Sequence, residues 1–197
     1  ELIRPMEWAI PHHQVTNPGD YEILLGANIV NYGKNARTNI NLNIQIEFDD
    51  LSGSAPSVVY NQNATSASLG INDSVVVTVP LFDPSQHGKG KYTIRYEASA
   101  AGTEDFPDDN IITTEFMVTD STYSKGRLDS AGMPVATGGI RPAIASGTTY
   151  EMGNAFYGGP NASRAVVNRV YFQMTANAGF TLQNETFVFN IYEWDDI

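Results

Sequence analysis

The densest group of potential metal ligands lies in the segment TEDFPDDN, residues 103–110. Carboxylates are good ligands for Ca²⁺, which takes about six to eight oxygen atoms. The segment lacks the glycine-punctuated alternation of acidic residues typical of calcium-binding loops, so a solvated loop before a strand is the alternative interpretation. We expect no cofactor beyond this candidate calcium ion, whose ligands would be Glu104, Asp105, Asp108 and Asp109.

Aromatic rings form a second candidate site, because an exposed ring can stack on a sugar. The candidate ligand-binding residues are Tyr157, Tyr192 and Trp194. The last two share one parity of the segment TFVFNIYEW, residues 186–194, which is apolar on both faces. At least one of those faces must be core or interface, so burial of these rings is the alternative interpretation.

No catalytic motif accompanies these residues. The chain has no G-x-S-x-G elbow, no G-x-x-x-x-G-K phosphate loop and no H-E-x-x-H pair. It has no cysteine, which excludes disulfides, thiolate ligands and thiol nucleophiles. Paired carboxylates for glycoside cleavage are related in space and not in sequence, and no acidic residue stands out by its context. We therefore expect a protein that is not an enzyme.

Composition and charge restrict the partners. The 197 residues include 22 acidic and 11 basic side chains, which give a net charge of −11. Such a surface opposes binding to nucleic acid and to anionic membranes. No apolar run reaches the length of a membrane span, so we expect no membrane insertion. A hydrophobic content of 42% is enough for a packed core.

The elements that carry these residues are predicted to be β-strands. Polar and apolar residues alternate from Asn39 to Phe48, which is typical of a half-buried strand. This alternation predicts that Ile40, Leu42, Ile44 and Ile46 are buried while Asn39, Asn41 and Asn43 face solvent. The turn-forming segment NYGKNA, residues 31–36, predicts a hairpin with the preceding strand, 21–30. Further strands are predicted at 57–60, 73–82, 90–100 and 110–118, with turn residues between them.

This pattern predicts an all-β chain with an immunoglobulin-like antiparallel β-sandwich, followed by a second, incomplete β unit. The predicted divisions are an N-terminal extension or linker (1–14), the sandwich (15–118), a Gly/Ser/Pro-rich linker (119–147) and the second unit (148–197). In the second unit, strands are expected at 149–157, 165–175 and 186–194. So few strands are marginal alone, and the last is apolar on both faces. We expect further polypeptide of a longer chain, or a partner chain, to cover it.

Three segments carry a family resemblance: IVNYGKNARTNINLNIQI (29–46), HGKGKYTIRYEAS (87–99) and FPDDNIITTEFMV (106–118). With their Asn-x-Gly turn at 31–33 and their Asp109-Asn110 pair, they resemble CARDB-type domains, which are immunoglobulin-like modules of bacterial secreted and cell-surface proteins. The later YEMGNAFY (150–157) and VFNIYEWDD (188–196) resemble a jelly-roll-like segment that follows such modules in cargo of the type IX secretion system. The sorting domain of that cargo is not visible.

The resemblance also implies candidate modification sites, because the same bacteria O-glycosylate tripeptides of Asp, Ser or Thr, and a small or aliphatic residue. Three such tripeptides begin at positions 73, 120 and 129. Asp-Ser is also a common turn pair, which is the alternative interpretation. The candidate glycosylation sites are Ser74, Ser121 and Ser130.

The resemblance carries no catalytic residues and implies an extracellular or bacterial cell-surface location. We expect a non-catalytic extracellular module of a large secreted or cell-surface protein, similar to type IX secretion cargo, that acts in spacing, display or adhesion. The alternative is a carbohydrate-binding module attached to a secreted hydrolase. The expected partners are other domains of the same longer chain or a partner protein chain, together with surface polysaccharide.

Overall fold

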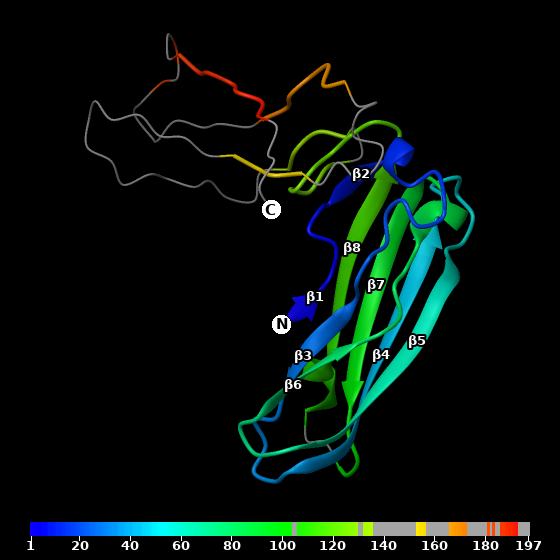
Figure 1. Cartoon of the computed structure of the whole chain (residues 1–197), viewed down its shortest axis with the longest axis vertical. Helices are drawn as coiled ribbons and strands as arrows, with labels where there is room; N and C mark the ends of the chain where they lie inside the picture. Colours follow the sequence, from blue (N-terminus) through cyan, green and yellow to red (C-terminus); the bar gives the residue numbers. More distant parts are fainter. Residues whose placement is uncertain are drawn as a thin grey trace.

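The computed structural model describes residues 1–103, 106–129, 132–135, 153–156, 166–172, 181, 183 and 186–192. Its strands form two facing β-sheets (Figure 1). Within the described residues there are eight strands and three short 3₁₀ helices: β1 (Leu2–Ile3), β2 (Ala9–Pro11), η1 (His12–Gln14), β3 (Gly26–Val30), β4 (Arg37–Asp49), β5 (Ser57–Leu69), β6 (Ser74–Thr78), η2 (Pro84–Gln86), β7 (Gly90–Ser99), η3 (Pro107–Asn110) and β8 (Ile111–Thr119). None of the described helices is long and apolar enough to cross a membrane.

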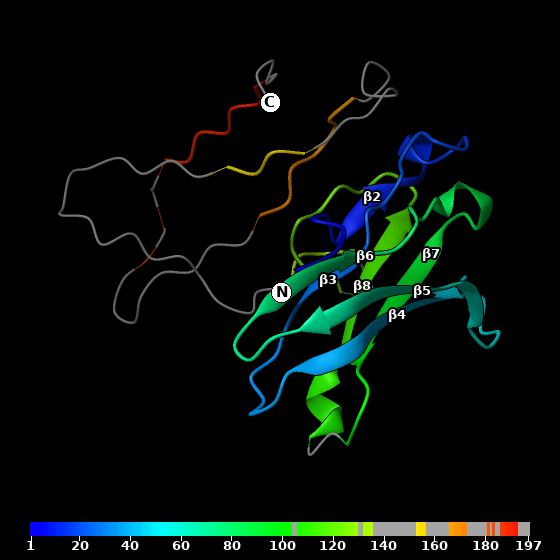
Figure 2. The ribbon, with the colours of Figure 1, turned by 60° about the horizontal axis from the view of Figure 1, so that its bottom comes forward.

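The strand order is that of an immunoglobulin-like sandwich. The smaller sheet has the order β1-β3-β6, and the larger has the order β2-β8-β7-β4-β5. Neighbouring strands are antiparallel except for β2, which runs parallel to β8. Figure 2 shows β3 and β6 as a layer in front of the larger sheet. The predicted all-β sandwich is therefore confirmed.

The core lies between the sheets and follows the predicted alternation. The inner face of β4 consists of Ile40, Leu42, Ile44 and Ile46, none of which is more than 2% exposed. Asn39 is exposed, and Asn41 and Asn43 are half-buried on the outer face of the same strand. Side chains from the smaller sheet, from the residue before β3 and from β7 complete the core; they include Leu25, Ala27, Val77, Tyr92, Ile94 and Tyr96. Burial of this apolar surface is the main force that holds the two sheets together.

Buried aromatic rings fill one part of the core. The rings of Tyr92 and Phe116 are stacked, with centroids 4.7 Å apart, and Phe82 lies edge-on to Tyr92. Burial raises the pKa of Tyr92 and of Tyr96, so both phenols stay protonated. Each donates a hydrogen bond, from Tyr92 to the Gly88 carbonyl at 2.6 Å and from Tyr96 to the Ile3 carbonyl at 3.0 Å.

The predicted hairpin between the first two long strands is wrong. β3 pairs with β1 and β6, whereas β4 pairs with β5 and β7. Residues 31–36 therefore carry the chain from one sheet to the other. The alternation of side chains shows which face of a strand is buried. It does not show whether the next strand pairs beside it in the same sheet or lies across the core in the other sheet.

The predicted N-terminal extension, residues 1–14, is instead part of the sandwich. β1 pairs with β3, β2 pairs with β8, and Ala9 and Ile10 are fully buried. Strands of two and three residues are too short to show a periodic pattern in sequence. The predicted linker, 119–147, also begins inside the fold, because Ser124 pairs with Ala9. The rest of that linker, from residue 136, lies outside the described residues.

β5 is much longer than the predicted strand at 57–60. It pairs with β4 from Ser57 to Leu69, with a register shift between Ile46 and Glu47 of β4. Its remaining part, NQNATSASL (61–69), is mostly polar and lies outside every predicted strand. Strand pairing uses backbone groups, so an edge strand whose inner face is only partly buried needs no apolar alternation.

Most of the predicted second unit, 148–197, lies outside the described residues. In its described parts, 153–156, 166–172 and 186–192, no strand is assigned and the side chains are exposed. Two of these parts contact each other, since the rings of Phe172 and Phe189 lie 4.5 Å apart between centroids. The jelly-roll-like unit and its cover by further polypeptide stay predictions.

The buried side chain of Asn31 joins two connections between the sheets. Its amide nitrogen donates to the carbonyls of Asn35 (2.9 Å), Leu69 (3.3 Å) and Gly70 (3.0 Å), and its amide oxygen accepts from the backbone N–H of Gly33 at 3.0 Å. The Asn31 backbone N–H also donates to the Asp73 carbonyl. One carboxamide therefore fixes the β3–β4 connection against the β5–β6 connection.

We predict that Asn31→Ala strongly destabilises the fold. The substitution leaves buried backbone groups unpaired, and each such group costs about 1–3 kcal/mol. The free energy of unfolding should fall by at least about 2 kcal/mol, which urea denaturation would measure. The matched control is Asn35→Ala, because the Asn35 side chain is exposed and the substitution keeps the carbonyl that Asn31 binds. Equal midpoints for the two variants would contradict the prediction.

Candidate functional site

The predicted calcium loop is only partly described. Asp108 and Asp109 lie in η3, and both are exposed. Glu104 and Asp105 lie outside the described residues. Within the part of the chain that the structure describes, no three His, Cys, Asp or Glu side chains gather as a metal site. The calcium site stays a prediction.

The other predicted site residues fall in separate regions. Ser74 is the first residue of β6 and Ser121 follows β8, and both are exposed. The side chain of Tyr192 is 69% exposed. The remaining predicted residues, Ser130, Tyr157 and Trp194, lie outside the described residues. The sugar-binding rings and the glycosylation sites therefore stay predictions.

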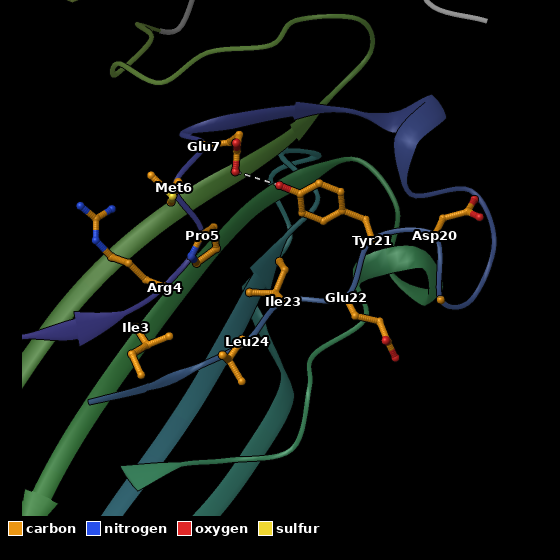
Figure 3. Close-up of a pocket in the computed structure, with 11 residues that line it drawn as sticks. Ile3, Arg4, Pro5, Met6, Glu7, Asp20, Tyr21, Glu22, Ile23 and Leu24 are labelled. Carbon is orange, nitrogen blue, oxygen red and sulfur yellow. Dashed lines mark hydrogen bonds between the residues drawn. The ribbon is translucent and has the colours of Figure 1, made fainter. Parts of the chain in front are cut away.

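A pocket of about 490 Å³ opens beside the first strands (Figure 3). Its walls are the segment from Ile3 to Glu7, which links β1 to β2, and the segment from Gly19 to Leu24, which leads into β3. In Figure 3, Arg4 and Glu22 point away from the contact between Glu7 and Tyr21. Sequence reasoning did not identify this pocket, because its two walls lack any motif.

Glu7 is a buried carboxylate at the edge of this pocket, with a side chain 7% exposed. Lys125 Nζ lies 2.7 Å from Oε1, and the Tyr21 hydroxyl donates to Oε2 at 2.8 Å. Burial raises the pKa of Glu7, but the hydrogen bonds from Lys125 and Tyr21 and the lysine charge outweigh it, so the pKa lies below its usual value. Both oxygens are held by donors of the protein, which makes Glu7 an anchor for Lys125.

Lys125 belongs to a segment that turns back after β8, residues 122–128, which we call the return segment. The backbone N–H groups of Trp8 and Ala9 donate to the Ser124 carbonyl at 2.7 and 3.0 Å. The guanidinium of Arg127 lies 5.0 Å from the Trp8 ring. The return segment thus covers the free edge of β2, and Arg127 covers the indole of Trp8.

A second candidate surface lies at the end of the sandwich where three connections meet. It consists of residues 31–36, 70–73, 100–103 and 106–110, and we call it the loop end. The strand registers place these connections together, at the lower end of the sandwich in Figure 1. Arg37 adds a brace by donating to the Thr103 carbonyl at 3.1 Å.

Each connection of the loop end presents one large apolar side chain to solvent. The exposed fractions are 85% for Tyr32, 55% for Ile71 and 73% for Phe106. Loops on a rigid scaffold are common binding surfaces, and aromatic side chains supply much of the binding energy at protein interfaces. The signal in the sequence was an aromatic residue inside a turn, in NYG and in DFP, where burial is not expected.

Comparison of the chain with protein-family models, with curated proteins and with solved structures gives no match.

We predict that Lys125→Met destabilises the fold in a pH-dependent way. Near neutral pH the variant leaves the Glu7 carboxylate buried without its cation, which should lower the free energy of unfolding by about 1–3 kcal/mol. Because the folded-state pKa of Glu7 is lowered, the ion pair stabilises the protein above the usual carboxyl pKa. That stabilisation is lost as the pH falls through the folded-state value.

Urea denaturation between neutral and acidic pH would measure this difference. The gap between wild type and variant should narrow as Glu7 becomes protonated. Lys34→Met is the control, because Lys34 is exposed at the loop end, away from Glu7. If the loss in free energy of unfolding is the same for both lysine variants, or does not depend on pH, the buried pair of Glu7 and Lys125 is not its cause.

Proposed function

We propose that this chain is a non-catalytic extracellular module of a large bacterial secreted or cell-surface protein, similar to cargo of the type IX secretion system. Its role is spacing, display or adhesion, and the loop end is the surface that makes contact. The observation that carries this proposal is the exposure of Tyr32, Ile71 and Phe106 on three braced connections at one end of the sandwich.

The bracing matters because a surface that is already ordered loses little entropy on binding. Asn31 fixes the connection that carries Tyr32 against the one that carries Ile71. Arg37 ties the beginning of β4 to the connection that carries Phe106. The loop end thus offers apolar groups in fixed positions, as an adhesive surface requires.

The other end of the sandwich supports a role as one module among several. The β1–β2 connection and the return segment are joined by the pair of Glu7 and Lys125 and by the backbone bonds of Ser124. Both segments through which the chain enters and leaves the sandwich are therefore fixed to it. A spacer needs this property, because a pull on the neighbouring chain would otherwise peel off its terminal strands.

We predict that the triple variant Tyr32→Ser, Ile71→Ser, Phe106→Ser loses adhesion. Beads coated with the full chain would be tested on surfaces of bacterial capsular polysaccharide, insoluble polysaccharides and immobilised proteins. Losing a cluster of binding side chains costs at least about 2 kcal/mol, so retention should fall more than tenfold. The control is Leu51→Ser with Leu81→Ser, because both leucines are exposed and both lie outside the loop end.

Unfolding midpoints would show that both sets of variants remain folded. Equal retention of the triple variant and the leucine control would contradict a role of the loop end in adhesion. Failure of the wild-type protein to adhere to any of these surfaces would count against the proposal as well.

The carbohydrate-binding alternative is favoured by one observation, the exposed ring of Tyr192. In that case Tyr192→Ala would abolish binding to insoluble polysaccharide, soluble sugars would compete, and the loop-end variant would bind normally. The same adhesion experiment therefore separates the two functions.

We also predict O-glycosylation at Ser74 and Ser121, since both are exposed and follow an aspartate. Protein secreted by a bacterium that has this glycosylation pathway should exceed the polypeptide mass of 21.5 kDa. Replacement of Ser74, Ser121 and Ser130 by Ala should remove the added mass, whereas Ser68→Ala should not, because Ser68 follows an alanine. An intact mass equal to that of the bare polypeptide would exclude the modification.

A further inference from the structure

Among the described residues, three of the four sheet edges are short or covered, and one is long and open. In the smaller sheet the edge strands are β1, with two residues, and β6, with five. In the larger sheet the edge of β2 is covered by Ser124 of the return segment. The fourth edge is β5, with 13 residues, and no described residue pairs with its outer side.

β5 also lacks most of the features that usually prevent an edge strand from pairing with another chain. Natural edges are protected by charged side chains, proline, bulges or short length. β5 contains no proline and no charged residue, and the whole segment 51–72 is uncharged. The one irregularity is the register shift opposite its first residues, which leaves the part from Tyr60 onward regular.

Amide side chains on the outer face of β5 can donate further hydrogen bonds. Asn43 of β4 donates to the side-chain oxygens of Asn61 (2.8 Å) and Asn63 (3.1 Å). Within the described structure, the NH₂ groups of Asn61 and Asn63 make no hydrogen bond of their own. Rows of asparagine amides across paired strands are a stabilising feature of self-assembled sheets.

We propose that β5 is the docking edge for a second copy of this chain, with the two β5 strands paired antiparallel about a two-fold axis at Gln62. This register places Asn61 opposite Asn63 of the second copy, and Asn63 opposite Asn61 of the second copy. The row of hydrogen-bonded asparagine side chains that begins at Asn43 then continues across the two-fold axis into the second copy. The two larger sheets join into one continuous sheet through backbone hydrogen bonds.

The uncharged edge permits contact with a second copy, and the positions of its amides favour a second copy over an unrelated strand. Two chains of net charge −11 repel each other wherever acidic residues meet. Contact through an uncharged strand keeps those acidic residues apart. The positions of Asn61 and Asn63, one residue on either side of Gln62, are self-complementary under a two-fold axis, whereas an unrelated strand would have to supply matching amides.

Sedimentation velocity of the full chain over a range of concentrations tests the proposal. We expect a concentration-dependent dimer, weakened more than tenfold by Asn61→Lys with Asn63→Lys, because the axis brings four lysines together. The control adds the same charge to the other sheet, in Val76→Lys with Thr78→Lys on the exposed side of β6. A wild-type chain that is monomeric at every concentration, or a dimer that the two pairs of lysines affect equally, would overturn the proposal.

A second measurement tests the register and does not depend on how well the lysine variants fold. The chain has no cysteine, so a single introduced thiol reports only on its own position. Gln62→Cys should give a covalent dimer with a short thiol-specific crosslinker, since the two thiols meet at the axis. Val58→Cys should not, because position 58 would lie opposite Ser66 of the second copy. Equal crosslinking at the two positions would overturn the proposed pairing.

Discussion

The sandwich depends on the buried carboxamide of Asn31, because two connections that run from one sheet to the other meet at this side chain. One crossing is the connection in which Asn31 lies, and the other runs from Leu69 to Asp73. A carboxamide suits this place, because it offers two N–H donors to the carbonyls and an oxygen that accepts from Gly33. An aspartate in this place could accept from Gly33 but could not donate to three carbonyls. The positions of two of the three connections of the loop end are thus set by a neutral hydrogen-bond network.

The opposite end is closed by chemistry of a different kind. There a charged pair, Glu7 with Lys125, joins the first strands to the return segment. Because both side chains are largely buried, salt screens this pair less than it screens a surface pair. Acid acts on Glu7 but not on the amide network of Asn31, so the two ends of the sandwich differ in their response to pH. A fall in pH would weaken the contact between Glu7 and Lys125, whereas the backbone hydrogen bonds of Ser124 and the amide network of Asn31 do not titrate.

The sequence predicts the strands that have one buried face and one solvent-exposed face. It does not predict the strands in which this contrast is missing. The alternation in β4 and β7 identified the core correctly, because those strands lie at the centre of a sheet with water on one side only. The polar part of β5 was missed, since its half-buried inner face carries small and polar residues such as Ala64 and Ser66, so the apolar alternation is absent. The N-terminal strands were missed because they are too short for any period.

The candidate site was harder to predict because its contacts are distant in sequence. Glu7 and Lys125 are separated by 118 positions, and neither stands in a motif. Of the predicted ligand residues that the structure describes, Asp108, Asp109 and Tyr192 are exposed, and their predicted partners lie outside the described residues. The exposed side chains of the loop end could have been suspected, since an aromatic residue in a turn has no core to enter.

The open edge and the loop end are geometrically linked if β5 pairs as proposed. All three connections of the loop end lie at the end of β5 that carries Leu69. Antiparallel pairing of two β5 strands therefore directs the two loop ends in opposite directions, at the far ends of one continuous sheet. Such a dimer could contact two surfaces at once, and its spacing would be fixed by backbone hydrogen bonds. Each contact then benefits from the other through effective concentration, so weak adhesion at a single loop end would be sufficient.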